Sequence, residues 1–87
     1  MNMDELYKSI YLKLLVMLQN LHPDVDFTTN NELVDSGILD SFDIVTLVSD
    51  IADIFEVIIS ANEIIPENFN SASALCTLIQ TKLEEEE

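Results

Sequence analysis

The stretch LVDSGILDSFDIVTLVSDIADIF, residues 33–55, joins turn-forming residues to the start of a helical pattern. Asp40 is a good N-cap residue, and Asp43 falls in the first turn, where a negative charge suits the helix dipole. Apolar residues then recur with a helical period: Ile44, Leu47, Val48, Ile51, Ile54 and Phe55. The stretch therefore predicts a helix that begins at Asp40 or Ser41 and ends near Phe55, with Ser41 displayed at its start.

Before this stretch, the sequence predicts one helix and a long loop. The helix spans Asp4 to Leu21, where apolar residues recur at spacings of three and four: Leu6, Ile10, Leu14, Met17, Leu18 and Leu21. Pro23 marks its end, because the residue before a proline disfavours the helical region. From His22 to Asp40 the period lapses into the loop-forming segments PDVD, TTNNE and DSG. A loop of this length is unusual in so small a domain, and such loops are often functional.

Residues 56–66 predict an extended connection followed by a short helix. The segment EVIIS (56–60) is rich in β-branched residues, but no second strand is available to pair with it. Ser60 and Glu63 form the S-x-x-E pattern of a capping box, so a short helix is expected to begin there. Pro66 is expected to end this helix soon afterwards, because proline interrupts helical hydrogen bonding.

A last helix is predicted to follow a cap at Asn70 or Ser71. Its inner face holds four apolar residues: Leu75, Leu78, Ile79 and Leu83. Cys76 lies on the packing side and is expected to be a small core residue, not a reactive thiol. We therefore expect an all-α domain over residues 1–83, with three main helices and one short helix around a single core. Residues 84–87 are expected to form an acidic C-terminal tail.

The charge balance restricts the classes of partner. The 87 residues include 17 acids and 3 lysines, for a net charge of −14. Such a surface repels phosphate backbones and anionic membranes, so we expect no nucleic-acid partner. The same field steers the protein towards basic patches on other proteins. Because 48 % of the residues are hydrophobic, the chain is too apolar to be a disordered acidic segment.

The sequence also suggests a location. No apolar run approaches the roughly 18 residues that a membrane-spanning helix needs, so membrane insertion is not expected. The first residues, MNMDELYKS, lack the basic n-region and the small-residue cleavage site of a signal peptide. The single cysteine cannot form an internal disulfide, which agrees with a reducing compartment. We expect a cytoplasmic monomer.

Catalysis by the chain itself is not expected. Ser41 as a nucleophile would need a general base and an oxyanion hole. The only histidine is His22, beside Pro23, and nothing in the sequence connects it to Ser41. The residues around Ser41 also differ from the G-x-S-x-G pattern of hydrolases. We interpret His22 as a surface residue.

Metal binding is not expected either. The segment that begins at Asp24 resembles the start of a calcium-binding EF-hand loop, with Asp35 at its twelfth position. However, the sixth position is Thr29 instead of glycine, and the twelfth favours the longer glutamate. No cluster of cysteine and histidine is available for a zinc site.

The remaining candidate is Ser41, a serine at a helix N-terminus for which the sequence indicates no catalytic partner residues. Such a hydroxyl suits modification by another enzyme, which needs an exposed residue on a rigid platform. A phosphodiester formed on Ser41 would lie near the positive end of the helix dipole. The alternative, which spacing alone favours, is that Ser41 is simply part of the cap of its helix.

The chain resembles the acyl and peptidyl carrier proteins, whose signature is approximately D-x-G-[hydrophobic]-D-S-[hydrophobic]-x-x-[hydrophobic]-x-L-[hydrophobic]. The residues in register are Asp35, Gly37, Asp40, Ser41, Phe42, Val45, Leu47 and Phe55. The resemblance extends over nearly the whole chain, because FEVIISANEIIPENFNSASALCTLI (55–79) is similar to the second half of such domains. It implies an acyl-carrier-like four-helix bundle with a long loop between the first two helices.

The resemblance also implies a cofactor and its site. Ser41, preceded by Asp40, would carry a 4′-phosphopantetheine arm transferred from coenzyme A by a phosphopantetheinyl transferase. The thiol of the arm would hold acyl or aminoacyl groups as thioesters, and Gly37 would let the loop turn closely beside the arm. The partners would be this transferase, a loading ligase, and downstream transferases or synthases.

In this family the second helix docks on basic patches of partner enzymes. The corresponding residues here are Asp40, Phe42, Asp43, Val45, Asp53 and Glu56. The face departs from that of the fatty-acid carriers, because Thr46 and Ala52 stand where acids are common and Phe42 replaces a leucine. The departures favour a dedicated set of partners over the general fatty-acid enzymes.

Three hypotheses follow. The first is a freestanding acyl carrier protein of a dedicated lipid, polyketide or related pathway, in which Leu47, Ile51 and Ile64 line a cavity for the acyl chain. The second is an aminoacyl or peptidyl carrier, because LDSF (39–42) resembles the D-alanyl carrier proteins. The third, from another class, is an acidic helical interaction module that is never modified. The sequence does not distinguish the cargo.

Overall fold

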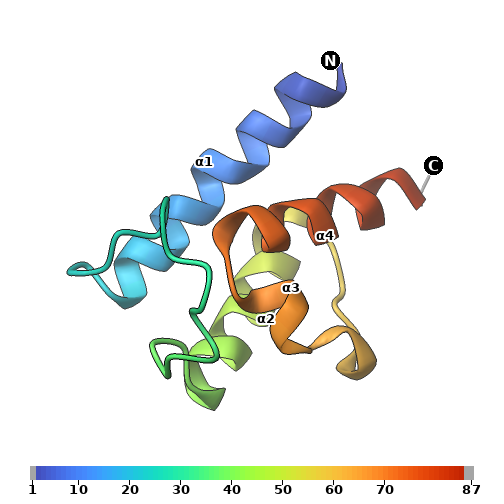
Figure 1. The fold of residues 1–87 in the computed structure, drawn as a ribbon. Coiled ribbons are helices and arrows are strands. Elements are labelled where there is room, and N and C mark those ends of the chain that lie inside the picture. The colour runs from blue at the N-terminus through green and yellow to red at the C-terminus, as the bar shows by residue number, and fades with distance from the viewer. Residues whose placement is uncertain (1, 86–87) are drawn as a thin grey trace.

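A computed structural model describes residues 2–85, and over this range the chain folds into helices without any strand (Figure 1). The elements in chain order are α1 (Met3–Leu21), α2 (Ser41–Phe55), the 3₁₀ turn η1 (Ala61–Glu63), α3 (Pro66–Phe69) and α4 (Ala72–Glu85). This arrangement confirms the all-helical prediction. None of these helices is long and apolar enough to cross a membrane.

The most extensive contact between helices joins the first helix to the last. α1 packs along α4, so the first and last helices lie side by side (Figure 1). α1 begins at the N-cap Asn2, whose side-chain oxygen accepts a hydrogen bond from the Glu5 N–H at 2.9 Å. It ends at Leu21, and Pro23 follows as the sequence predicted.

A single apolar core joins the helices to the connecting segments. Its members from α1, α2 and α4 are Ile10, Leu14, Met17, Leu18, Leu47, Ile51, Ala72, Leu75, Cys76 and Ile79. The connections and α3 add Phe27, Leu33, Leu39, Val57, Ile59 and Phe69. Because three of these side chains belong to the segment 22–40, the long loop is fixed to the core at several points.

Residues 57–60 are extended, as predicted, whereas Glu56 has a left-handed backbone conformation and caps the end of α2. Val57 and Ile59 are buried, whereas Ile58 between them is exposed. This alternation is typical of an extended chain whose successive side chains point to opposite sides. The segment thus covers the core without forming a strand.

The predicted role of Pro66 as the end of a helix is wrong. Pro66 does not end a helix; it occupies the first position of α3, where its missing N–H would have no helical partner and its fixed φ favours helix formation. The capping box at Ser60 and Glu63 starts only the three residues of η1. α4 includes Glu84 and Glu85, the first two residues of the predicted acidic tail. The remainder of the predicted tail lies outside the described residues.

Candidate functional site

Ser41 is the first residue of α2, and its side chain is exposed. The preceding Asp40 caps the helix: its carboxylate accepts the Asp43 N–H at 2.9 Å. The Asp43 carboxylate in turn accepts the Asp40 N–H at 3.2 Å, which completes a capping box. Among residues 2–85, no side chain forms a hydrogen bond with the Ser41 hydroxyl. The hydroxyl is therefore held on a rigid helix end and is open to a modifying enzyme.

The backbone at this end favours an anion on Ser41. The first intrahelical bond of α2 runs from the Ile44 N–H to the Asp40 carbonyl at 3.0 Å. The N–H groups of Ser41 and Phe42 precede this bond and belong to the positive end of the helix dipole. A phosphodiester on Ser41 would lie beside them, so the residues present fit a phosphate-linked arm.

Gly37 adopts a conformation that other residues rarely take. Its φ is +83°, and its N–H donates to the Val34 carbonyl at 3.0 Å in a tight turn. A Cβ added at Gly37 would meet no atom within 4 Å. The glycine is therefore favoured by its backbone angle, which lets the loop turn shortly before Ser41.

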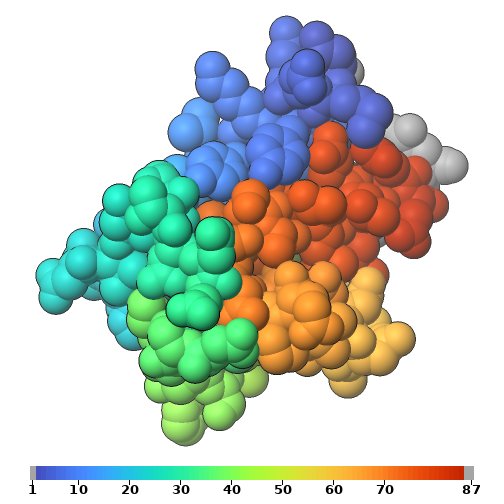
Figure 2. Space-filling model, in the orientation of Figure 1, coloured from blue at the N-terminus to red at the C-terminus, as the bar shows by residue number. Residues whose placement is uncertain are grey.

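Asn70 holds the turn that leads to Ser41, a contact that no sequence pattern predicted. Its side-chain oxygen accepts the N–H groups of Val34 at 3.0 Å and Asp35 at 3.1 Å, and its amide donates to the Asp35 carboxylate at 3.1 Å. Its carbonyl accepts the Leu33 N–H at 3.0 Å. In Figure 2 this part of the loop (green) lies directly against the chain between α3 and α4 (orange).

His22 makes a second contact that was not predicted. Its Nε2 atom lies 2.7 Å from Oδ2 of Asp43, and the two side chains are 33 % and 16 % exposed. His22 is thus half-buried and tied to α2, whereas the sequence suggested a surface residue. Burial tends to raise the pKa of Asp43, but hydrogen bonds from His22 and the Asp40 N–H outweigh it and lower that pKa. Nothing in the contacts of His22 makes it a base for Ser41.

The predicted docking face has an apolar end and an acidic end. Phe42 and Val45 are 85 % and 67 % exposed near Ser41, and Asp53 and Glu56 are exposed at the other end of α2. The spacing of these residues places them along one side of the helix. Asp43 differs from them, because its carboxylate is occupied by the contacts described above.

The cavity expected for an acyl chain is not formed. Leu47 and Ile51 are completely buried and belong to the same packed core as Val57 and Phe69. Ile64 is partly exposed and lies outside this core. No pocket opens anywhere in residues 2–85. The core beneath α2 is therefore closed in this structure.

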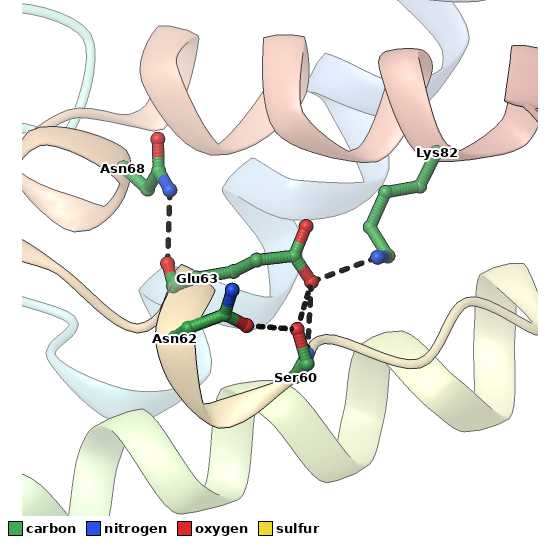
Figure 3. Close-up of polar contacts among 5 residues, drawn as sticks. All are labelled: Ser60, Asn62, Glu63, Asn68 and Lys82. Carbon is green, nitrogen blue, oxygen red and sulfur yellow. Dashed lines mark hydrogen bonds and ion pairs between the residues drawn. The ribbon is translucent and has the colours of Figure 1, made fainter.

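A compact hydrogen-bond network fixes η1 against α4 (Figure 3). One carboxylate oxygen of Glu63 accepts the Ser60 N–H at 2.9 Å, the Ser60 hydroxyl at 2.7 Å and the Lys82 ammonium at 2.8 Å. The Lys82 hydrogen bond contributes most to a lowered pKa of Glu63, about 2. Asn68 donates from its side chain to the Glu63 carbonyl at 2.9 Å.

The segment that resembled a calcium loop is a local turn. The Asp26 carboxylate accepts the Thr28 N–H at 2.9 Å and also the Thr28 hydroxyl. A side chain that accepts a hydrogen bond from the backbone N–H two residues later is typical of an Asx turn. Within residues 2–85, no three potential ligand side chains come together at a metal-binding distance.

Comparison with known proteins adds no further assignment. The sequence matches no family model, and neither the curated proteins nor the solved structures gave a significant match.

Proposed function

We propose that the chain is a carrier protein that holds acyl intermediates as thioesters on a 4′-phosphopantetheine arm attached to Ser41. One observation carries the proposal: an exposed serine, whose hydroxyl has no side-chain partner among residues 2–85, begins a well-capped helix beside the exposed Phe42. This geometry supports modification by another enzyme, and it agrees with the resemblance of residues 33–55 to the carrier signature.

The attachment reaction needs no catalytic group from this chain. The Ser41 oxygen forms a bond to the phosphorus that bears the pantetheine in coenzyme A. The bond from this phosphorus to the bridging oxygen breaks, and adenosine 3′,5′-bisphosphate leaves. The transferase accepts the serine proton. The product is an anionic phosphodiester beside the free N–H groups at the start of α2, where the helix dipole favours a negative charge.

Once modified, the chain acts by tethering. The arm supplies the thiol that holds the cargo, and the rigid helix end holds the arm where partner enzymes can reach it. A tethered intermediate has a higher effective concentration at each active site than a free one. The carrier is thus a substrate of several enzymes and not an enzyme itself. The free thiol of Cys76 suits a reducing compartment such as the cytoplasm.

The surface around Ser41 supports a particular kind of partner. Phe42 and Val45 offer apolar contacts close to the modified serine, while Asp53 and Glu56 offer negative charge farther along α2. A complementary partner would have an apolar rim at the entrance to its active site and basic residues beside it. The transferase, the loading ligase and the downstream enzymes would share this pattern.

A second candidate within the carrier class is an aminoacyl carrier. The observation that favours it is the closed core beneath α2, in which Leu47 and Ile51 are completely buried. A small polar cargo remains in solvent and needs no such cavity, whereas a long acyl chain gains from shelter. Loading the modified protein with octanoyl and alanyl groups tests this. If both cargoes stay exposed, both thioesters should hydrolyse as fast as a model thioester. Slower hydrolysis than that of the model thioester would show protection by the protein and would contradict this view.

The modification itself is tested by mass spectrometry of the intact protein. The purified chain is incubated with coenzyme A and a broad-specificity phosphopantetheinyl transferase. The parent and a Ser49→Ala control on the same helix should each gain one phosphopantetheinyl group, and Ser41→Ala should gain none. If several transferases leave the folded parent unchanged, the carrier proposal fails and an unmodified interaction module takes its place.

A further inference from the structure

The residues that position Ser41 extend beyond its own helix. The segment from Leu33 to Leu39 forms a series of turns, in which the Ser36 N–H donates to the Glu32 carbonyl at 2.7 Å. The Leu39 N–H donates to the Leu33 carbonyl at 2.9 Å and closes the segment. Asp40 and Ser41 follow directly, so the path of the chain into α2 depends on how these turns are held.

Asn70, which lies outside this segment, holds the turns of residues 33–39 in place. It comes 35 residues later in the chain than Asp35, and both its side-chain oxygen and its side-chain nitrogen are used at Val34 and Asp35. Its own N–H donates to the Pro66 carbonyl at 2.8 Å, which fixes it to the end of α3. Leu33 and Leu39, at the two ends of the turns, are buried in the core. The loop before Ser41 is therefore fastened to α3 by hydrogen bonds and to the core by apolar contacts.

We propose that Asn70 is a positioning residue for the modification of Ser41. This inference rests on the proposed carrier function and assigns a role to a side chain that does not touch the serine. By fixing the turns at Val34 and Asp35, Asn70 keeps the approach to Asp40 and Ser41 in the single geometry that a transferase binds. It also makes α3 and the Ser41 loop move as one unit.

The structure offers a matched control for this role. Asn68 is also half-buried, and its side chain donates a hydrogen bond to the backbone carbonyl of Glu63. Its hydrogen bond fixes η1, not the loop before Ser41 (Figure 3). Asn68→Ala and Asn70→Ala each remove a partly buried side-chain hydrogen bond near α3, but only Asn70→Ala releases the Ser41 loop.

The experiment measures phosphopantetheinylation at saturating coenzyme A, at a temperature where circular dichroism shows every variant to be folded. Asn70→Ala should raise the KM for the carrier by about threefold and leave kcat within twofold, and Asn68→Ala should leave both unchanged. Amide hydrogen exchange at Val34 and Asp35 should quicken by about tenfold in Asn70→Ala only, because the hydrogen bonds from these two amides to the Asn70 side chain are lost.

A pair of substitutions tests the contact itself. Asn70→Asp alone places two carboxylates together, because the Asn70 amide nitrogen lies 3.1 Å from the Asp35 carboxylate. Adding Asp35→Asn restores a donor and an acceptor with their roles exchanged, so the double variant should return to within twofold of the parent KM.

The outcomes separate the two proposals. If the parent is modified at Ser41 but Asn70→Ala matches Asn68→Ala in both KM and exchange, the positioning role is overturned and the carrier function stands. If no transferase modifies the folded parent, both proposals are overturned together.

Discussion

The Nε2 atom of His22 lies 2.7 Å from Oδ2 of Asp43, and this contact joins the end of α1 to the first turn of α2. Asp43 also accepts the Asp40 N–H, so a single carboxylate takes part in the helix cap and in the link between the two helices. The start of α2 is therefore anchored from two directions, by His22 on this side and by Asn70 through the preceding loop.

Removing the His22 contact should destabilise the fold. We expect His22→Ala to lower the free energy of unfolding by about 1 kcal/mol, since a partly buried hydrogen bond to a charged group is lost. Urea unfolding of His22→Ala, Asp43→Asn and the double variant forms a double-mutant cycle that measures the coupling. Strictly additive effects would show that the two side chains do not interact.

Asp43 should also contribute to acid sensitivity. Its pKa in the folded protein lies below the usual aspartate value of 3.8, so its stabilising effect is present above that pH and is lost as the pH falls through the lowered pKa. Asp43→Asn should therefore flatten the loss of stability below about pH 4. Unfolding midpoints measured from pH 6 to pH 2 check this, and an unchanged pH profile would contradict it.

The ion pair between Glu63 and Lys82 should be a second contact that is lost in acid. The pKa of Glu63 is lowered from the usual glutamate value of 4.5 to about 2 in the folded protein, chiefly by the Lys82 hydrogen bond. The resulting stability is fully present above pH 4.5 and disappears as the pH falls towards 2. Lys82→Met should reduce the difference in thermal midpoint between pH 6 and pH 3, whereas Lys8→Met, on the exposed side of α1, should preserve it. Equal profiles for the two variants would rule out this role for Lys82.

Cys76 should be unreactive in the folded protein. The thiol is buried and donates to the Tyr7 carbonyl at 3.3 Å, and burial raises its pKa to about 11. A disulfide reagent at pH 8 should therefore react with no thiol in the native unmodified chain and with one in urea. After phosphopantetheinylation, one thiol should react without urea. Rapid reaction of the native unmodified protein would show that Cys76 is accessible.

Phe42 should contribute to docking but not to folding. Because its side chain is 85 % exposed, Phe42→Ala should leave the thermal midpoint unchanged. We expect the KM of the transferase for this variant to rise about fivefold, in the range typical of an aromatic interface contact. Val16→Ala is the matched control, since Val16 is exposed on α1, away from α2. An equal KM for both variants would exclude Phe42 from the docking surface.

The periodic parts of the fold were predictable from the sequence. α1 and α2 end within a residue of the predicted positions, because apolar spacing, the Asp40 cap and Pro23 all give local signals. Pro66 was misinterpreted because a proline can end one helix or begin the next, and the sequence alone does not say which.

The contacts around Ser41 could be predicted only in part. The capping box of Asp40 and Asp43 depends on residues three apart, and the sequence indicated the cap. The contacts of His22 with Asp43 and of Asn70 with Asp35 join residues 21 and 35 positions apart. They depend on how the helices pack, and no local pattern of residue types encodes them.

The division of α2 into an apolar end and an acidic end also bears on how long a carrier remains with each enzyme. Negative charge at Asp53 and Glu56 accelerates encounter through long-range attraction. Phe42 and Val45 together form only a small apolar contact, far below the roughly 1,200 Å² of surface that stable complexes bury. Small contacts dissociate quickly, because affinity differences appear mainly in the dissociation rate. A carrier with this surface would bind each enzyme fast and release it soon, so that its residence time, rather than its affinity, sets the order in which enzymes act on the same cargo.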